Sequence, residues 1–202
     1  MPKKSGRPVK DNCKIENKQL IINTAIELIK KHGADYITVR NICNAADIGT
    51  GTFYYHFKNK DDLLIYFLKE KSFDEFNLSI PIEKIDERIS ELYMHLINRY
   101  MNLGQDFMKS FYTTGNRSLS AYMGEVDGEF TSGTVMHRCE KELLKAKEKD
   151  IINNNADIHE LSMDICTIVK GCVFEWCLTD GNMDIKSSLY RIIKMYMSSF
   201  IS

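Results

Sequence analysis

Residues 38–60 read TVRNICNAADIGTGTFYYHFKNK, and this stretch predicts a helix, a tight turn and a second helix that leads directly into a third. Thr38 is suited to cap the first helix, because its side-chain oxygen can accept a hydrogen bond from a backbone N–H that lacks a partner in the first turn. Apolar residues at positions 39, 42, 43 and 46 then recur with helical spacing. Asp47 lies where the chain must turn, and Asp suits this position because it tolerates unusual backbone conformations.

The second helix of this stretch has two chemically different faces. Phe53 and Phe57 are four residues apart and are expected to pack into the core. The consecutive residues Tyr54, Tyr55 and His56 cannot all point inward on one helix. Exposed phenol and imidazole groups suit phosphates and base edges, so the pattern predicts a helix-turn-helix whose second helix enters the major groove of DNA.

The segments TVRNICNAADI and GTFYYHFKNKDDLL resemble the DNA-binding signature of the TetR family of bacterial transcriptional regulators, over roughly residues 15–69. Family members usually carry Gly-Val-Ser where this chain has Asp47-Ile48-Gly49, so the Ser cap is absent and Gly49 offers a backbone N–H instead. The resemblance implies phosphate contacts for Thr38, Tyr54, Tyr55, His56 and Lys60. The further candidate DNA-binding residues are Arg40, Gly49, Thr50, Gly51 and Thr52. Thr52 and Tyr55 are expected at base edges, and Arg40 at bases or phosphates.

The charge distribution agrees with a nucleic-acid partner at one end of the chain. The net charge is only −1, but residues 1–72 contain 13 Lys and Arg against 8 Asp and Glu, whereas residues 73–202 contain 14 against 20. Residues 1–14, MPKKSGRPVKDNCK, are basic and without periodicity. They are interpreted either as a solvated tail or as an arm that places Arg7 in an adjacent minor groove.

The composition is that of an ordinary globular protein, with 202 residues of which 44% are hydrophobic and 27% charged. No apolar run approaches the roughly 18 residues of a membrane span, and the N-terminus is too charged for a secretory signal. Six cysteines occur without a CxxC pair or a regular framework, so they are interpreted as reduced thiols of a cytoplasmic protein. No metal site and no cofactor are predicted.

The expected architecture is all-α, with about nine helices and no strand. The domains are a basic flexible arm (1–14), a three-helix helix-turn-helix DNA-binding domain (15–60) and a helical ligand-binding and dimerisation domain (61–202). Beyond the helix-turn-helix stretch, helices are expected over 16–32, from Asn59 to about residue 76, and over 81–104, 106–112, 130–149, 158–179 and about 184–200. The charge run EKELLKAKEKD, residues 140–150, is interpreted as a solvated surface.

The last two helices have more apolar surface than one another would cover, so they are expected to pair with a second copy of the chain in a four-helix dimer interface. Such a homodimer implies a pseudo-palindromic operator. The family resemblance also implies a small-molecule effector in the C-terminal domain and, as the default outcome, repression. Aromatic, Met and other apolar residues are the candidate pocket lining: Tyr93, Met94, Ile97, Tyr100, Met101, Phe107, Phe111, Tyr112, Met123, Phe130, Cys172 and Trp176.

Other functions were weighed against this one. A transcriptional activator, a metal- or redox-responsive regulator and a non-specific DNA-packaging protein are the alternatives among DNA-binding proteins. An enzyme would need a nucleophile and a base, for example Cys139 with His137 or Cys166 with His159, but neither pair lies in a recognisable motif. The residues therefore favour a regulator over an enzyme.

Overall fold

The computed structural model of the protein describes residues 9–33, 36–69, 72–101, 104–105, 108–109 and 125–202. These residues form eight helices and one two-stranded sheet. The elements are α1 (Val9–His32), α2 (Val39–Ala46), α3 (Thr50–His56), α4 (Lys60–Lys69), α5 (Ile85–Met101), β1 (Glu125–Val126), β2 (Glu129–Phe130), α8 (Val135–Glu148), α9 (Ile158–Leu178) and α10 (Ile185–Met197). Among the helices of the described residues, none combines the length and apolar character that a membrane span requires.

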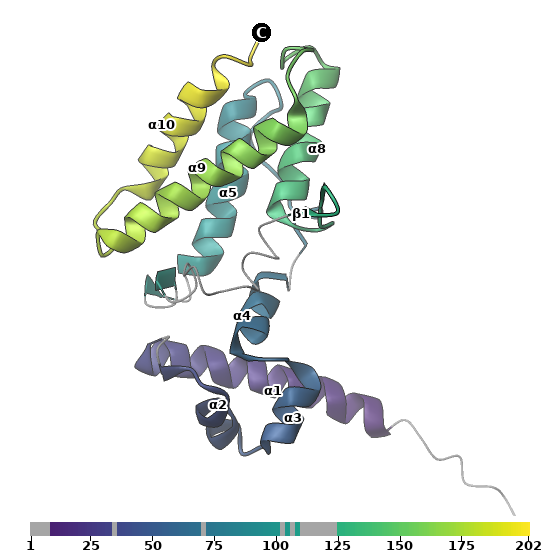
Figure 1. Ribbon diagram of the computed structural model, residues 1–202, viewed down its shortest axis with the longest axis vertical. Coiled ribbons are helices and arrows are strands. Elements are labelled where there is room, and N and C mark those ends of the chain that lie inside the picture. Colours follow the sequence, from purple (N-terminus) through teal and green to yellow (C-terminus); the bar gives the residue numbers. More distant parts are fainter. Residues whose placement is uncertain (1–8, 34–35, 70–71, 102–103, 106–107, 110–124) are drawn as a thin grey trace, which may run out of the picture.

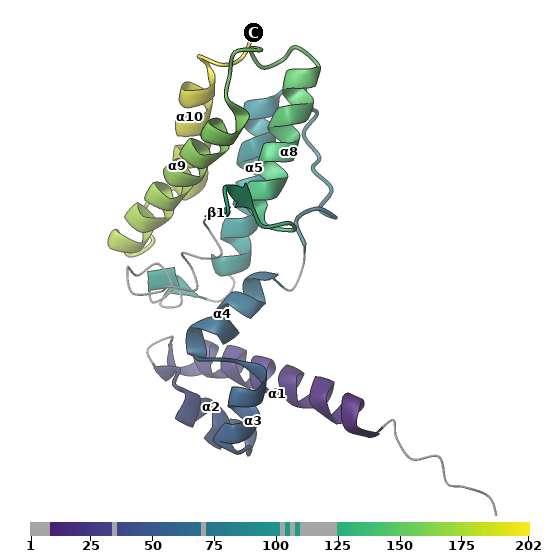
Figure 2. The same cartoon turned by 45° about the vertical axis from the view of Figure 1, so that its right-hand side comes forward.

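Helices α1, α2 and α3 form the head, which lies at the lower end of Figures 1 and 2. α1 packs against both α2 and α3, and the three helices share one apolar core. Its fully buried side chains come from all three helices: Ile21, Ile22, Ala25, Ile42 and Phe53. α1 begins at Val9 rather than at residue 16, so residues 9–14 of the expected flexible arm are helical.

Helix α4 leads from the head to the body, as both views show (Figures 1 and 2). It is held to the head because the Lys18 ammonium of α1 lies 3.9 Å from the centre of the Tyr66 ring, a cation–π contact. The expected helix from Asn59 to residue 76 is wrong at its end, since the chain is no longer helical from Ser72. Residues 72–80 instead form an irregular segment, called the connector below.

Among the residues that the structure describes, four helices form the body. α5 packs between α8 and α10, and α9 packs against the same two helices (Figure 1). α9 and α10 have the bounds expected to within a few residues, and Asp157 caps α9 by accepting from the Glu160 N–H at 3.0 Å. α5 begins at Ile85 instead of 81, because residues 81–84 form a turn in which the Lys84 N–H bonds the Pro81 carbonyl. The short helix expected over 106–112 falls largely outside the described residues.

A small antiparallel hairpin contradicts the expectation that the chain has no strand. Glu125 pairs with Phe130 and Val126 with Glu129. The two residues between them, Asp127 and Gly128, both have positive φ, the conformation of a tight hairpin turn. The helix expected to start at Phe130 therefore starts at Val135, where the Thr134 side chain accepts a hydrogen bond from the His137 N–H.

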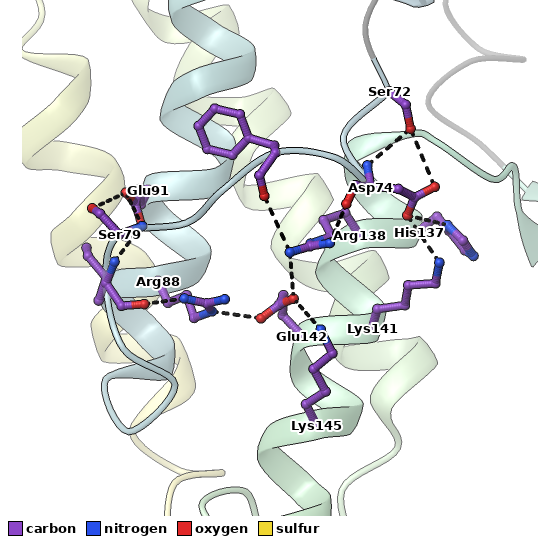
Figure 3. A network of polar contacts seen from close by, with 12 residues as sticks. Ser72, Asp74, Ser79, Arg88, Glu91, His137, Arg138, Lys141, Glu142 and Lys145 are labelled. Carbon is purple, nitrogen blue, oxygen red and sulfur yellow. Dashed lines mark hydrogen bonds and ion pairs between the residues drawn. The ribbon is translucent and has the colours of Figure 1, made fainter.

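The charge run over residues 140–150 is not a solvated surface throughout, because Glu142 is completely buried. It lies on the inner stripe of α8 with Cys139 and Ala146, one turn away on either side. Its carboxylate pairs with Arg88 at 2.7 Å, Arg138 at 3.1 Å and Lys145 at 2.9 Å (Figure 3). Three cations compensate the desolvation that a buried carboxylate would otherwise suffer.

Candidate nucleic-acid interface

The turn between α2 and α3 is built from local interactions. Thr38 Oγ1 accepts a hydrogen bond from the Asn41 N–H at 3.1 Å and so caps α2 as predicted. Asp47 ends α2 in the left-handed conformation, with φ 52°, and the Ile48 N–H bonds the Cys43 carbonyl at 3.0 Å. Gly49 precedes α3 without a side-chain cap, and no atom lies within 4 Å of the position a Cβ would occupy. The first N–H groups of α3 therefore start at an open surface.

Helix α3 separates its aromatic residues as the sequence predicted. Phe53 and Phe57 are buried, whereas Tyr54 and Tyr55 are 58% and 64% exposed. His56 is half-buried and meets the Tyr55 ring edge-on, with ring centres 4.9 Å apart. A helix anchored by two buried phenyl rings thus presents two phenol groups to solvent, which is an arrangement suited to phosphates and base edges.

The remaining predicted contact residues lie at the ends of neighbouring elements. Thr38 and Arg40 are exposed at the start of α2, and Thr50 and Gly51 are exposed in the first turn of α3. Lys60 is the first residue of α4, half-buried, at the end where backbone N–H groups favour an anion. Thr52 is half-buried, and Arg7 lies outside the described residues.

The start of α4 is also held in place by local hydrogen bonds. The Asn59 side chain accepts from the Asp62 N–H at 2.8 Å, and the Asp62 carboxylate accepts in return from the Lys58 N–H at 3.0 Å. The arrangement resembles a capping box, although the return hydrogen bond comes from the residue before the cap. It fixes the backbone on both sides of Lys60.

The body contains a cavity of about 500 Å³ between α5, the end of α9 and the start of α10. Its lining is mixed in chemistry: Met94, His95, Asn98, Met101, Trp176, Gly181, Met183, Asp184, Ile185, Lys186 and Tyr190. Of the pocket residues predicted from sequence, Met94, Met101 and Trp176 line this cavity. Residues 181–186 were missed because they belong to a turn and a helix start, and no apolar periodicity marks them.

Five other predicted pocket residues that the structure describes are not part of this lining. Tyr93, Ile97 and Tyr100 are fully buried in the core, and Cys172 is almost so. Phe130 is buried against the His159 ring, with ring centres 4.6 Å apart. Four further candidates, Phe107, Phe111, Tyr112 and Met123, lie outside the described residues.

The cysteines and histidines considered for catalysis do not form activated pairs. Burial raises the pKa of the Cys139 thiol, which lies beside the Tyr93 hydroxyl, and burial also raises the pKa of Cys166. His137 faces Asp74 at 3.6 Å, and His159 lies between Glu140 at 2.7 Å and Glu125 at 3.0 Å. These thiols are therefore neutral, and each of the two imidazoles is paired with carboxylates. No cluster of three or more potential ligands suited to a metal ion occurs among the described residues.

Known proteins resemble this chain first over the head and then over nearly its whole length. A family described as "Bacterial regulatory proteins, tetR family" matches residues 21–67. The fatty acid metabolism regulator protein of Bacillus subtilis (strain 168) is 39% identical over 198 residues, an alignment that covers 88% of this chain and 92% of that protein. A helix-turn-helix regulator of Staphylococcus aureus (strain bovine RF122 / ET3-1) is 40% identical over 55 residues, which is 27% of this chain and 30% of the relative. The similarity to the Bacillus protein thus extends well beyond the DNA-binding head.

Solved structures share the fold at low identity. The fatty acid degradation regulator FadR from Bacillus halodurans has a TM-score of 0.56 at 21% identity and covers 96% of both chains. SmeT, the repressor of a multidrug efflux pump of Stenotrophomonas maltophilia, has a TM-score of 0.57 at 18% identity and covers 92% of this chain and 90% of its own. The dihydroxyacetone kinase operon activator DhaS has a TM-score of 0.56 at 14% identity, covering 93% and 99%. A repressor and an activator therefore share this architecture.

Proposed function

Because the chain belongs to the TetR family of bacterial regulatory proteins, we propose that it is a homodimeric repressor of genes for fatty-acid metabolism, released from its operator by a small molecule. The chain is a DNA-binding transcriptional regulator and not an enzyme. The observation that supports the DNA-binding surface is the pair of exposed tyrosines on α3, a helix whose phenylalanines are buried. The link to fatty acids rests on the similarity to the fatty acid metabolism regulator protein of Bacillus subtilis.

The operator contacts follow from the placement of the head residues. Tyr54, Tyr55 and His56 lie on the recognition helix, with Thr52 and Tyr55 proposed at base edges. Lys60 meets a phosphate at the N-terminus of α4, and the N–H groups at Gly49 and Thr50 meet another. Phosphate contacts give affinity and orientation, while base contacts give sequence preference.

The proposed dimer uses the outer faces of α9 and α10, which lie side by side in the body (Figure 1). Phe174 and Leu178 on α9 and Met195 on α10 are large apolar side chains exposed to solvent in the single chain. Gly171 lies on the same face of α9, and no atom lies within 4 Å of where its Cβ would be. Two copies of this face can therefore approach closely around a two-fold axis.

The proposed effector is a compound with an acyl chain. The cavity offers flexible Met side chains and an indole ring to an apolar chain, while Lys186 and His95 are polar groups of its lining. Fatty acids of short, medium and long chain are the first compounds to test for release of the operator. A ligand acts only through its preference for the form that does not bind the operator, and a few kcal/mol of preference suffices.

Selection of bound duplexes from a random DNA pool tests the proposal. The wild-type protein is expected to enrich a palindrome, and Tyr55→Ala and Lys60→Ala are expected to lose about tenfold or more in affinity for it while remaining dimers. Tyr36→Ala is the matched control, because Tyr36 is an exposed tyrosine of the head outside the recognition helix. Enrichment of no motif, with binding that simply fades as salt rises, would favour a non-specific DNA-binding protein.

Activation is the second candidate outcome, because the activator DhaS shares the fold over 93% of this chain. A reporter gene under the selected operator distinguishes the two in cells that carry or lack the protein. Repression predicts higher expression in cells that lack the protein, whereas activation predicts lower expression.

A further inference from the structure

The connector lies along one face of α5 and runs in the opposite direction. The Arg99 guanidinium lies 4.2 Å from the centre of the Phe73 ring, and the His95 ring lies 4.0 Å from that of Phe76. Further along, the Glu91 carboxylate accepts hydrogen bonds from the N–H groups of residues 79 and 80, at 3.0 to 3.1 Å. Successive turns of α5 therefore contact successive residues of the connector.

Helix α8 also holds the connector (Figure 3). The Arg138 guanidinium donates to the Asp74 carbonyl at 2.8 Å and to the Phe76 carbonyl at 3.5 Å, while it is itself paired with buried Glu142. The Asp74 carboxylate accepts from Lys141 at 3.1 Å. The connector is thus held on α5 and α8 by charged and aromatic side chains, rather than crossing the surface freely.

His95 contacts the connector and also lines the body cavity. It lines the cavity together with Met94 and Asn98, and its ring also packs on Phe76. Burial and the nearby Arg99 lower the pKa of His95, against the opposing effect of Glu91. The ring is therefore uncharged near neutral pH, as suits packing against a phenyl group.

We propose that His95 couples occupancy of the cavity to the DNA-binding head by pushing on Phe76 of the connector. This inference rests on the proposed function and identifies how occupancy of the effector site is transmitted to the head. A group that fills the cavity displaces the His95 ring, and Phe76 moves with it. The Phe76 N–H bonds the Phe73 carbonyl at 3.2 Å, and buried Phe73 is only four residues beyond the last described residue of α4. Movement of Phe76 thus changes how α4 leaves the body.

A double-mutant cycle tests this coupling without knowledge of the natural effector. Asn98→Trp places a large side chain in the cavity from an exposed position of α5, and we expect it to raise the operator Kd about tenfold. In a Phe76→Leu background, which removes the ring but stays apolar, the same substitution is expected to raise the Kd less than about threefold. Glu75→Ala is the matched control, because Glu75 is the exposed neighbour of Phe76, and it should leave the tenfold effect intact.

Substitution of His95 itself gives a second arm. His95→Phe retains a ring and is expected to preserve the effect of Asn98→Trp, whereas His95→Ala is expected to abolish it. Met183→Trp fills the cavity from the opposite wall and replaces Asn98→Trp if that variant does not fold by circular dichroism. An equal effect of cavity filling in the Phe76→Leu and wild-type backgrounds overturns the proposal, as does an operator Kd that does not respond to filling. Failure of the wild-type protein to select any operator would instead overturn the proposed function.

Discussion

Replacement of Glu142 by Gln tests whether the buried charge cluster stabilises the body. The carboxylate is the only acidic member of a cluster with Arg88, Arg138 and Lys145. The two arginine side chains are 15% and 14% exposed, whereas that of Lys145 is 53% exposed. Glu142→Gln retains the shape and one carbonyl acceptor, but it leaves two largely buried guanidinium groups without a counter-charge.

The expected cost follows from these exposures. Removal of one partner from a buried ion pair costs about 3–5 kcal/mol, and an exposed pair such as that with Lys145 contributes about 1 kcal/mol or less. Because the single Gln oxygen can still accept a hydrogen bond from one of the two guanidinium groups, we expect the lower end, about 3 kcal/mol of the free energy of unfolding. Such a loss is a large fraction of the stability of a typical domain.

The pH dependence of the difference in unfolding free energy between wild type and Glu142→Gln gives a second check. Burial alone would raise the pKa of Glu142, but hydrogen bonds from Lys145 and Arg88 and the charges of Arg88 and Arg138 lower it below its usual 4.5. A depressed folded-state pKa stabilises the protein at pH values above 4.5, and this contribution is lost as the pH falls through the lowered pKa. The difference between wild type and Glu142→Gln should therefore shrink in acid.

Urea unfolding followed by circular dichroism, at one fixed protein concentration, measures the effect. Glu87→Gln is the control, since Glu87 pairs with Lys84 on the surface of α5 at 3.4 Å with side chains 40% and 60% exposed. It is expected to cost less than about 1 kcal/mol. If Glu142→Gln cost no more than Glu87→Gln at neutral pH, the cluster would not stabilise the body and the reasoning would be refuted.

Three further predictions concern single residues. Thr38→Ala removes the cap of α2 and is expected to lower the free energy of unfolding by about 1 kcal/mol in urea. Asp47→Val forces a β-branched residue to φ 52° and is expected to cost about 1–3 kcal/mol, whereas Asp47→Gly should cost less in the same measurement. The hydrogen bonds to Glu140 and Glu125 raise the pKa of His159 above 6.5, against the opposing effect of burial. Protonated His159 therefore stabilises the folded protein below pH 6.5, and this contribution is lost as the pH rises through the raised pKa. Tm measured across this range should therefore fall less steeply in His159→Gln than in wild type.

The head could be predicted from sequence because its defining interactions are local. The cap of α2 joins Thr38 to Asn41, and the cap of α4 joins Asn59 to Asp62, each pair three residues apart. Phe53 and Phe57 reveal the buried face of α3 through their spacing alone. Interactions within one helical turn are visible in a single sequence, since residue types and spacing specify them together.

The body was predicted less completely because its interactions join distant segments. Glu142 lies in a run of charges whose composition suggests solvent, and its partner Arg88 is 54 residues away in the sequence. A signal was present, because Glu142 shares the helical stripe of Cys139 and Ala146, but the charge run obscured it. Asp127-Gly128 similarly marked the hairpin, although the apolar pattern after it favoured a helix.

The most consequential error, the helix expected to continue to residue 76, bears on regulation. A continuous helix would have joined head and body as one rigid rod, because consecutive helical turns are held by their own backbone hydrogen bonds. In the structure, Phe73 and Phe76 pack on Arg99 and His95 of α5 instead. The orientation of the head then depends on side-chain contacts of the connector. Each of these contacts is weaker than the backbone hydrogen bonds of several helical turns, and a bound ligand can displace it. A ligand with a preference of a few kcal/mol can shift such contacts, whereas it could not break several turns of helix.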